Sequence, residues 1–423
     1  MTDRAHPWTR FATRRARLAI LIVAVVVLAL KVLVAMRTYG TQDIRSWAAF
    51  AEGVKDRGPV GIYGINFQQI NGDLYNHPPL VGYYLEVVNA LAGWGVPLKV
   101  TIRVVSSIAD VVSSLVIFEI LRRRRSLGCA TLSGILVAAS PVLFLISGYH
   151  GNTDPVFLML VLLGGYLVVE KRMGLLGGAA FGLAIGVKLV PVIVLPIIAV
   201  YMIIYRRELL ARAAAGFGFV VVVSWLPAVL GEWGPLKRNV FGYSGIPYRP
   251  WGLVHFADTL GWSSAAGFMI GPGKDIVLMV CAVAPAVLVW RRPQLVGESI
   301  GLSLVLFLVL SPAFGVQYLA WASATAYLLD VWSAALYNIV GGIFLFEVYD
   351  KWNNGFPWSG VAAGQNFTAP ELFGAALVWA SLVVVLVRGT QQMVRRNRAE
   401  EPQNDAALSA QAVRSPEERA ELA

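Results

Sequence analysis

Long apolar segments separated by short polar turns run through most of the chain. Each segment approaches the roughly 20 residues that an α-helix needs to cross the hydrocarbon core of a bilayer. The pattern predicts about 12 spanning helices, within a range of 10 to 13 because the turns at Lys188 and Asp330 are weakly marked. The predicted fold class is therefore an all-α polytopic membrane protein. The spans cover residues 18–36, 101–121, 128–147, 154–170, 173–187, 190–205, 212–230, 275–290, 297–312, 316–329, 332–349 and 371–388.

The amino-acid composition agrees with this pattern. Apolar residues make up 57% of the 423 residues and charged residues only 14%, whereas a soluble domain contains roughly half apolar and a quarter charged residues. So small a charged fraction supplies too little polar surface for a water-soluble globule of this size. The composition excludes an ordinary soluble enzyme.

Basic residues mark the turns on one side of the predicted membrane. The net charge is +10, and the basic residues cluster between apolar segments, as they do in cytoplasmic turns. A nucleic-acid-binding patch would instead gather on one soluble domain. Both termini are therefore predicted to face the cytoplasm. The clusters lie at Arg4–Arg17, Arg122–Arg125, Lys171–Arg172, Arg206–Arg207, Arg291–Arg292 and Arg395–Arg396.

The predicted organisation has three parts. Residues 1–17 form a cytoplasmic N-terminus, residues 18–388 a transmembrane domain and residues 389–423 a polar cytoplasmic tail. The first apolar segment has no small-residue cleavage pattern behind it, so we predict an uncleaved span and not a signal peptide. Cys129 and Cys281 both lie in or beside apolar segments, which offers neither a disulfide framework nor a thiolate metal site.

Two long loops are predicted on the external side of the membrane. They cover residues 37–100 and 231–274 and exceed the usual length of a connection, which suggests a function. The apolar stretch 79–95 lies within the first loop, and threading it as a span would move Arg122–Arg125 to the outside. We therefore predict a helix on the membrane surface there, and we expect any chemistry on this external face.

Asp43 follows the first span immediately, in the sequence Gly-Thr-Gln-Asp-Ile-Arg-Ser-Trp. An ionisable group at the membrane boundary is a candidate functional residue. A helix N-cap, or an ion pair with Arg45, would explain the same carboxylate without any function. Position alone leaves both interpretations open.

Three more polar segments fall at predicted external boundaries. His77 precedes two prolines that fix the backbone before the surface helix. His150, Asn152 and Asp154 lie in one turn after the third span, where ordinary turn chemistry explains the last two but not the histidine. Lys188 lies between two apolar segments, so its charge needs a partner or an anionic ligand, unless the side chain reaches the interface.

Further candidates come from the second half of the chain. Gln317 and Tyr318 interrupt the apolar pattern at the outer end of the ninth span, and Arg249 adds a cation in the second external loop. All three fall near the same predicted membrane boundary.

The order and spacing of these motifs resemble the C-type glycosyltransferase superfamily. The segment around Asp43, the element Tyr-Asn-His-Pro-Pro-Leu, the turn Tyr-His-Gly-Asn-Thr-Asp and Lys188 are similar to motifs of the dolichyl-phosphate-glucose-dependent glucosyltransferases. The bacterial polyprenyl-phosphate-mannose-dependent enzymes are similar in plan. The motifs lie within about residues 37–190, and the remainder of the chain is similar only in layout.

The chain departs from the glucosyltransferase pattern at three places. His77 stands where those enzymes have tyrosine, and Asn152 and Thr153 replace part of their polar turn. Gln317 and Tyr318 occupy the region where they carry a His-Glu pair. These changes leave the sugar and the acceptor open.

The resemblance implies an inverting transfer of a hexose, mannose or glucose, from a polyprenyl-phosphate sugar to an acceptor hydroxyl on the non-cytoplasmic face. The acceptor would be lipid-linked or part of the cell envelope. Asp43 would be the general base, since a carboxylate within reach can take the proton of the attacking hydroxyl. The leaving phosphate is already ionised, so cations and donors need only stabilise its charge. The candidates for binding donor or acceptor are His77, His150, Asn152, Asp154, Lys188, Arg249, Gln317 and Tyr318.

No metal or other cofactor is predicted, because the first loop holds no Asp-x-Asp pair. The predicted partners are the polyprenyl-phosphate donor, the lipid-linked or glycan acceptor and membrane lipids, without nucleic acid. We expect a multi-pass protein of a bacterial plasma membrane with its active site outside. The alternatives are a transporter or lipid flippase, which would favour an internal repeat that the chain does not show, and a polymerase or ligase of surface polysaccharide.

Overall fold

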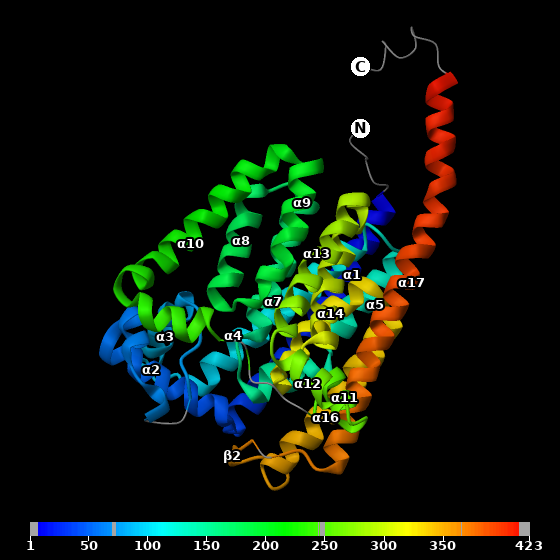
Figure 1. Cartoon of the computed structure of the whole chain (residues 1–423). Helices are drawn as coiled ribbons and strands as arrows, with labels where there is room; N and C mark the ends of the chain where they lie inside the picture. Colours follow the sequence, from blue (N-terminus) through cyan, green and yellow to red (C-terminus); the bar gives the residue numbers. More distant parts are fainter. Residues whose placement is uncertain (1–6, 70–72, 244, 246–249, 365, 414–423) are drawn as a thin grey trace.

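The chain folds into a bundle of helices with one minimal pair of strands (Figure 1). The computed structural model describes residues 7–69, 73–243, 245, 250–364 and 366–413. Within these residues, eight helical segments are long and apolar enough to cross a membrane, and three shorter apolar helices accompany them. The predicted class, an all-α polytopic membrane protein, is confirmed. The number of 12 spans stays a prediction.

Most helices begin and end close to the predicted spans, but the first starts well before residue 18, the last continues well past residue 388 and the span predicted at 128–147 is divided into shorter helical segments. The long helices are α1 (Pro7–Arg37), α4 (Leu98–Leu121), α10 (Arg207–Leu236), α13 (Gly273–Arg291), α14 (Val296–Leu310), α16 (Val331–Trp352) and α17 (Ala369–Val413). The shorter helices of the bundle are α5 (Leu127–Ala138), α6 (Pro141–Leu145), α7 (Asp154–Val169), α8 (Gly174–Val187), α9 (Leu195–Tyr205) and α15 (Ala320–Leu329). The helices of the two long loops are α2 (Gln42–Gly61), α3 (Pro79–Gly93), α11 (Gly252–Thr259) and α12 (Ser263–Ile270).

Glycines let α8 and α10 pack at close range, side by side in Figure 1. A Cβ at Gly178 would lie 2.0 Å from the carbonyl oxygen of Ala213, and a Cβ at Gly216 would lie 2.0 Å from that of Leu175. No larger residue fits either position. Close backbone approach through small residues is how helices associate in lipid, where apolar surface alone gives no preference for a protein partner.

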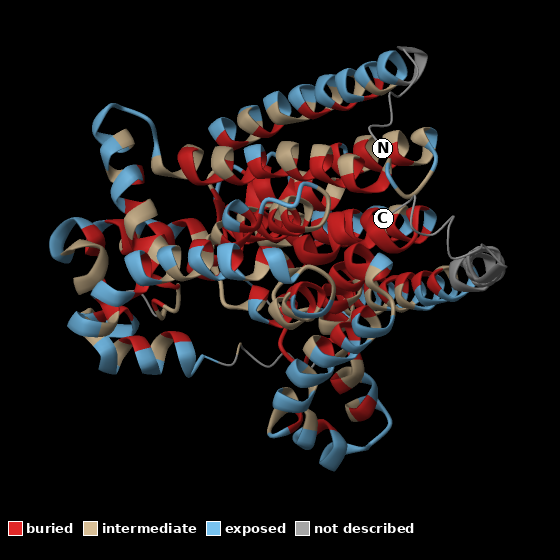
Figure 2. Cartoon of the chain, turned by 90° about the horizontal axis from the view of Figure 1, so that it is seen from above, coloured by how far each residue is buried: buried red, intermediate tan, exposed pale blue. Residues whose placement is uncertain are grey.

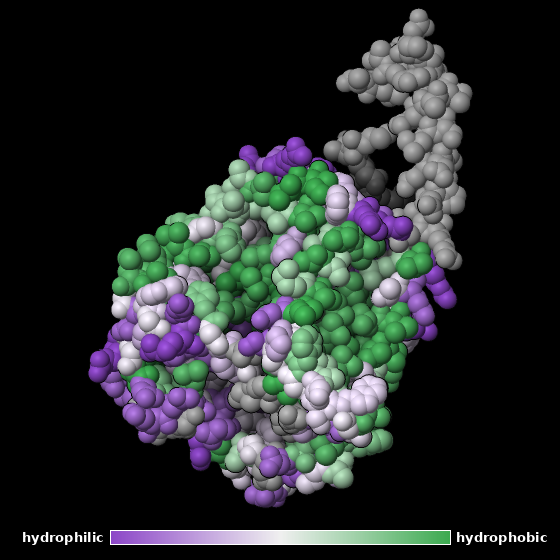
Figure 3. Space-filling model, viewed as in Figure 1, coloured by the Kyte–Doolittle hydropathy of each residue, from purple (hydrophilic) through white to green (hydrophobic). Residues whose placement is uncertain are grey.

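Buried residues fill the centre of the bundle, and exposed residues lie on its outer helices (Figure 2). Many of the exposed residues are large and apolar, such as Ile22 of α1, Phe219 of α10 and Met279 of α13. Figure 3 shows apolar surface over α10 and α13, with hydrophilic surface above and below it. An apolar belt of this kind suits contact with lipid chains.

The turns that were predicted to be cytoplasmic lie together at one end of the bundle, where ion pairs join them. Arg17 bonds Glu119 at 2.7 Å. Arg124 bonds Glu170 at 2.8 Å and Glu298 at 3.0 Å. We call this the basic end.

The weakly marked turn at Asp330 also lies at the basic end. Arg125 donates to the carbonyl oxygens of Leu328 at 2.7 Å and Leu329 at 2.9 Å. The side chain of Gln392, on α17, donates to the Asp330 carboxylate. A basic residue therefore does mark this turn, but it comes from a turn some 200 residues earlier in the chain.

The first long loop folds over the opposite end of the bundle. Its helices α2 and α3 pack on each other and on α10, around a core that includes Trp47, Phe50 and Tyr75. The surface helix predicted for residues 79–95 is α3, which begins at Pro79 as the two prolines indicate. The loop is thus a folded unit that covers one end of the membrane domain.

A cysteine-labelling experiment tests the predicted threading. Trp94 and Phe356 are 83% and 79% exposed at the end covered by the first loop, and Lys171 lies at the basic end. In a variant without Cys129 and Cys281, an impermeant maleimide should label Trp94→Cys and Phe356→Cys in intact cells. It should label Lys171→Cys only after permeabilisation, because that turn is predicted to be cytoplasmic. Labelling of Lys171→Cys in intact cells would reverse the threading.

Candidate active site

Asp43 lies in the first turn of α2, where the chain leaves α1. Thr41 is the N-cap residue of this helix, so Asp43 does not cap it. The partners of the carboxylate are also not Arg45. Its Oδ2 accepts hydrogen bonds from His150 Nε2 at 3.0 Å and from Asn152 Nδ2 at 2.8 Å. Both structural explanations offered for Asp43 are therefore wrong.

Arg103 of α4 supports the corner between α1 and α2. Its guanidinium donates to the carbonyl oxygen of Ala35 at 3.3 Å, to the hydroxyl of Thr38 at 3.1 Å and to the carbonyl oxygen of Tyr39. Gly40 lies directly above with φ of +106°, and a Cβ there would lie 2.1 Å from Arg103 Nη2. The cation meets the free carbonyls at the end of α1, where the helix dipole is negative. Arg103 thereby holds the backbone between α1 and α2, which leads to Asp43.

The corner is also joined to the C-terminal part of the chain. Strand β1 (Gly40–Thr41) pairs in parallel with strand β2 (Val361–Ala362), which follows α16. This pair leads directly into α2, so Thr41, two residues before Asp43, is anchored to a segment more than 300 residues away.

His150 ends a π-helical turn, η3 (Ile146–His150), between α6 and α7. Gly151 follows with φ of +81°, a conformation that glycine adopts readily. Its carbonyl oxygen accepts from Trp47 Nε1 at 3.0 Å, and the carbonyl oxygen of His150 accepts from Thr41 Oγ1 at 3.0 Å. The turn that carries His150 is therefore bound on both sides to the start of α2.

The partners of His150 determine which ring nitrogen holds the proton. A carboxylate oxygen only accepts hydrogen bonds, so Nε2 carries the hydrogen that it donates to Asp43. Nδ1 lies 2.8 Å from the hydroxyl of Tyr349 on α16, within hydrogen-bonding distance. Tyr349 thus holds the ring in the orientation that directs Nε2 at Asp43.

Asp43 is ionised in this environment. Burial raises the pKa of its carboxyl, but the charge interaction with His150 and the hydrogen bonds from His150 and Asn152 outweigh burial, and Lys188 adds a smaller effect. The net pKa lies below the usual value of an aspartate. The side chain keeps 35% of its surface exposed, and within the described residues no hydrogen bond reaches Oδ1. Among the described residues, Oδ2 therefore has two partners and Oδ1 has none.

His77 is held as a neutral imidazole beside this carboxylate. Its ring stacks on Trp47 with 4.5 Å between centroids, and its carbonyl oxygen accepts from the Tyr63 hydroxyl at 2.6 Å. Burial and the nearby charge of Lys188 lower the pKa of His77 to about 3, although Asp43 opposes them. His77 can therefore exchange hydrogen bonds with a ligand, but it brings no positive charge.

Lys188 follows α8 and brings the cation of the site. Its ammonium bonds Asp154 at the start of α7, whose Oδ1 also accepts from Trp321 Nε1 at 2.7 Å. The same ammonium lies 5.1 Å from the ring centroid of Tyr318 and 5.4 Å from that of Trp321. The partner that the sequence requires for Lys188 is thus Asp154, with two aromatic faces around the charge.

Burial changes the interpretation of three predicted binding residues. His150, Asn152 and Asp154 are predicted to contact donor or acceptor, but all three side chains are buried, and Asp154 has no exposed surface. They hold Asp43 and Lys188 instead of lining an open face. We therefore revise their expected role from binding to positioning.

The remaining predicted residues are not equally close to Asp43. Tyr318 lies over Lys188, and its hydroxyl bonds Tyr243, which also bonds Asn76. Gln317 is half-buried with its side chain turned back over Gly315. In the described part of the chain it makes no hydrogen bond with Asp43, His150 or Asn152. Arg249 lies outside the described residues.

Three aromatic residues of the site were missed from the sequence. Tyr349, Trp321 and Tyr243 supply hydrogen bonds to His150, Asp154 and Tyr318, respectively. The first two lie near ends of predicted spans at the same boundary as Asp43. Their position at this boundary could have indicated a role in the site, although other aromatic residues at the same boundary share it.

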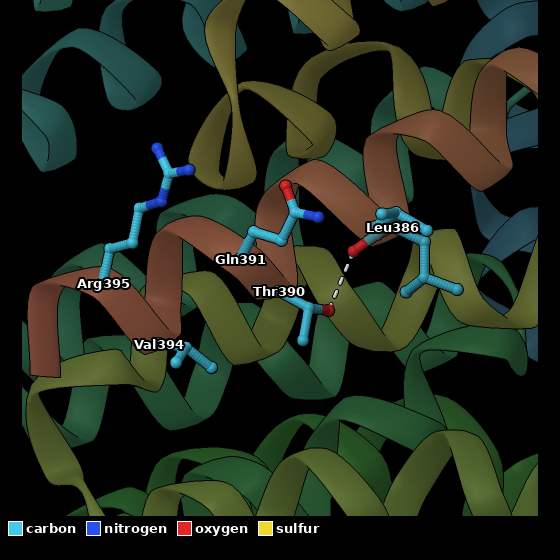
Figure 4. Close-up of a pocket in the computed structure, with 6 residues that line it drawn as sticks. Leu386, Thr390, Gln391, Val394 and Arg395 are labelled. Carbon is cyan, nitrogen blue, oxygen red and sulfur yellow. Dashed lines mark hydrogen bonds between the residues drawn. The ribbon is translucent and has the colours of Figure 1, made fainter. Parts of the chain in front are cut away.

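One surface hollow lies away from this cluster. It has a volume of about 470 Å³ and is lined by one face of α17 (Figure 4). The lining residues flank Gln392, which bonds Asp330 at the basic end. The hollow therefore belongs to the other end of the molecule and has no part in the chemistry of Asp43. Its lining residues are Leu386, Val387, Thr390, Gln391, Val394 and Arg395.

Residues 76–230 match the family model of dolichyl-phosphate-mannose-protein mannosyltransferases. The match extends from α3 to α10 and includes His77, His150 and Lys188, while Asp43 precedes it. These 155 of the 423 residues are similar to a family of the C-type glycosyltransferase superfamily, which supports the predicted superfamily. The resemblance to this superfamily, which the sequence motifs indicated, is thereby confirmed.

Two further comparisons accompany this glycosyltransferase match. No curated protein matches the chain in sequence. Among solved structures, it is similar to the crystal structure of ArnT from Cupriavidus metallidurans bound to undecaprenyl phosphate, with 15% sequence identity and a TM-score of 0.47. The similarity covers 89% of this chain and 77% of that one.

The Lys188–Asp154 pair should respond asymmetrically to mutation. Asp154 is fully buried, whereas Lys188 keeps 21% of its side chain exposed. Lys188→Met leaves a buried carboxylate without its cation, a loss of about 3 kcal/mol. Asp154→Asn leaves a lysine that can reach water. Thermal unfolding of the detergent-purified protein should show a lower Tm for Lys188→Met than for Asp154→Asn.

The double variant completes this measurement. Lys188→Met with Asp154→Asn should recover part of the stability that Lys188→Met loses, because no unpaired charge stays buried. A Tm for Asp154→Asn equal to or below that of Lys188→Met would show that Lys188 does not stabilise the protein by pairing with the buried Asp154.

Proposed function

We propose that this membrane glycosyltransferase moves a hexose, mannose or glucose, from a polyprenyl-phosphate sugar to a hydroxyl of a lipid-linked or cell-envelope acceptor. The reaction is an inverting displacement at the anomeric carbon on the non-cytoplasmic face. Asp43 is the general base.

The arrangement of the Asp43 carboxylate carries the proposal. His150 and Asn152 hold Oδ2 at 3.0 and 2.8 Å, which fixes the orientation of the carboxylate. Oδ1 is left for the acceptor hydroxyl, whose proton it takes as the new glycosidic bond forms. Because the pKa of Asp43 is lowered, the carboxylate is ready to act as a base at neutral pH.

The charges around Asp43 suit a phosphate leaving group. The bond that breaks joins the anomeric carbon to a phosphate oxygen, and that phosphate leaves as an ionised group without a proton donor. Lys188 lies near enough to lower the pKa of both Asp43 and His77, and part of its side chain is exposed. We propose that Lys188 binds the donor phosphate, with Arg249 as a second cation.

His77 and Tyr318 complete the proposed binding site. His77 is neutral and partly exposed beside Asp43, so it can orient a sugar or acceptor hydroxyl without attracting the phosphate. Tyr318 offers its ring face beside the ammonium of Lys188. Gln317 keeps its proposed part in binding only if its side chain turns away from Gly315.

The family description supports the donor class. Dolichyl phosphate is a polyprenyl phosphate and mannose is a hexose, so the matched family acts on donors of the proposed kind. The match supports the class of donor more strongly than it supports the identity of the sugar. Mannose and glucose differ at one stereocentre, which one or two hydrogen bonds can select.

A panel of radiolabelled donors tests the proposed function. Purified protein in lipid vesicles should transfer label from polyprenyl-phosphate mannose or glucose to an acceptor in an extract of cell-envelope lipids and glycans. A nucleotide sugar should give no transfer. Movement of a labelled lipid across the vesicle without transfer would indicate a flippase, and transfer of preassembled oligosaccharides alone would indicate a polymerase or ligase.

Substitution of Asp43 tests whether its carboxylate acts as the base or has only a structural role. Asp43→Asn keeps the size of the side chain and its ability to accept from His150, but it cannot take a proton, so turnover should fall by a factor of about 100 or more. Asp43→Glu should also be slow, because the carboxylate moves by one methylene. Initial rates at saturating donor measure both effects.

Asp56→Asn is the matched control for this substitution. Asp56 is an exposed carboxylate on the same helix, α2, and its variant should keep wild-type turnover. An Asp43→Asn protein that folds and turns over at near wild-type rate would exclude Asp43 as the base.

A further inference from the structure

A charged pair lies inside the bundle, within two membrane-spanning helices. Lys31 of α1 and Asp110 of α4 are 1% and 3% exposed, and their Nζ and Oδ2 atoms lie 2.6 Å apart. Ionisable residues inside a membrane domain are costly and usually serve a function. Neither residue reaches substrate in the site described above, so their role must be indirect.

The pair is bound to the turn that carries His150. Ser147, in η3, donates its hydroxyl to the same Oδ2 of Asp110 at 2.6 Å. Gly148 lies against the stem of Lys31, where a Cβ would approach Lys31 Cγ to 3.0 Å and Cα to 3.2 Å. One carboxylate oxygen therefore joins α1, α4 and η3 at a single point.

A second contact from α4 holds the other side of the same turn. Ser106 donates its hydroxyl to the carbonyl oxygen of Asn152 at 2.5 Å. Ser106 and Asp110 are four residues apart on α4, so they lie on the same face, one helical turn from each other. The segment between Ser147 and Asn152, which contains His150, is thus fastened to α4 at both ends.

We infer that Lys31, Asp110 and Ser147 are positioning residues that hold η3 in the register that brings His150 to Asp43. This inference rests on the proposed role of Asp43 as the base. A π-helical turn is a rare conformation that is found mostly at functional sites, and it needs support because its backbone geometry is less favourable than that of an α-helix. The buried carboxylate provides that support by accepting from two donors on different elements.

The effect of releasing the turn follows from the charges that face Asp43. Without His150 in place, the two largest causes that lower the pKa of Asp43 would be lost, so its pKa would rise. The base is active only when it is deprotonated, so the acidic limb of the pH profile would move to higher pH. The groups that face Asp43 or interact with its charge are His150 from η3, His77 before α3, Lys188 after α8, Tyr243 in the second loop, Tyr318 before α15 and Tyr349 from α16.

Ser147→Ala is the sharpest test, because it leaves the Lys31–Asp110 pair intact and removes only its bond to the turn. The matched control is Ser303→Ala, which removes a buried serine bond of 2.7 Å between α14 and the Cys281 carbonyl. Asp110→Asn leaves Lys31 unpaired, and this variant is used only if it purifies as a folded protein.

Two measurements on these variants decide the inference. In hydrogen–deuterium exchange, Ser147→Ala should speed exchange of the amides of residues 146–153 by about tenfold, and Ser303→Ala should not. In donor kinetics, Ser147→Ala should lower kcat by about tenfold or more. It should also move the acidic limb of kcat/KM upward by about one pH unit, with Ser303→Ala at wild-type values.

The outcomes separate this inference from the proposed function. Unchanged exchange in residues 146–153 would show that the pair does not hold the turn, whatever the enzyme acts on. Faster exchange with an unmoved acidic limb would show that the turn does not control Asp43, and the pair would be structural only. Full activity of Asp43→Asn would overturn the proposed base, while the exchange result would still decide whether the pair holds η3.

Discussion

The hydrogen bonds from His150 and Asn152 to Asp43 are the interaction on which the site depends. They join residues that are 107 and 109 positions apart in the chain. Two other contacts hold these bonds in place: Arg103 supports the corner before α2, and the Tyr349 hydroxyl contacts Nδ1 of His150. Each contact comes from a different helix, so the carboxylate is oriented by the packing of the whole bundle.

The bilayer explains why these polar groups are arranged as they are. Inside the hydrocarbon region every polar group must be hydrogen-bonded within the protein. The chain therefore crosses the membrane as helices, and the polar side chains that remain partly exposed lie at one end. The buried charges obey the same constraint: Arg103 meets the carbonyls at the end of α1, and Lys31 meets Asp110. At the exposed end, Oδ1 of Asp43 has no hydrogen bond from the residues that the structure describes, and ligand or water can reach this partly exposed side chain.

The charges of the site are divided among residues with distinct environments. The charge interaction with His150 and the hydrogen bonds from His150 and Asn152 keep the pKa of Asp43 low, and burial and Lys188 keep His77 neutral. Lys188 is paired with Asp154 yet remains partly exposed. An ionised carboxylate, a neutral hydrogen-bonding group and a cation are thus available together at neutral pH. That combination suits a reaction in which a hydroxyl attacks and a phosphate leaves.

The sequence by itself determined the spanning helices, the long first loop and the polar turns that hold His77, His150 and Lys188. Those features depend on consecutive residues: the length of an apolar run, the prolines before α3 and the charges between spans. Only the tertiary structure decided the partners. Asp154 is the carboxylate that pairs with Lys188, and Tyr349 reaches His150 from 199 residues away. A local pattern shows that a polar group needs a partner, but the packing of helices distant in the chain chooses which one.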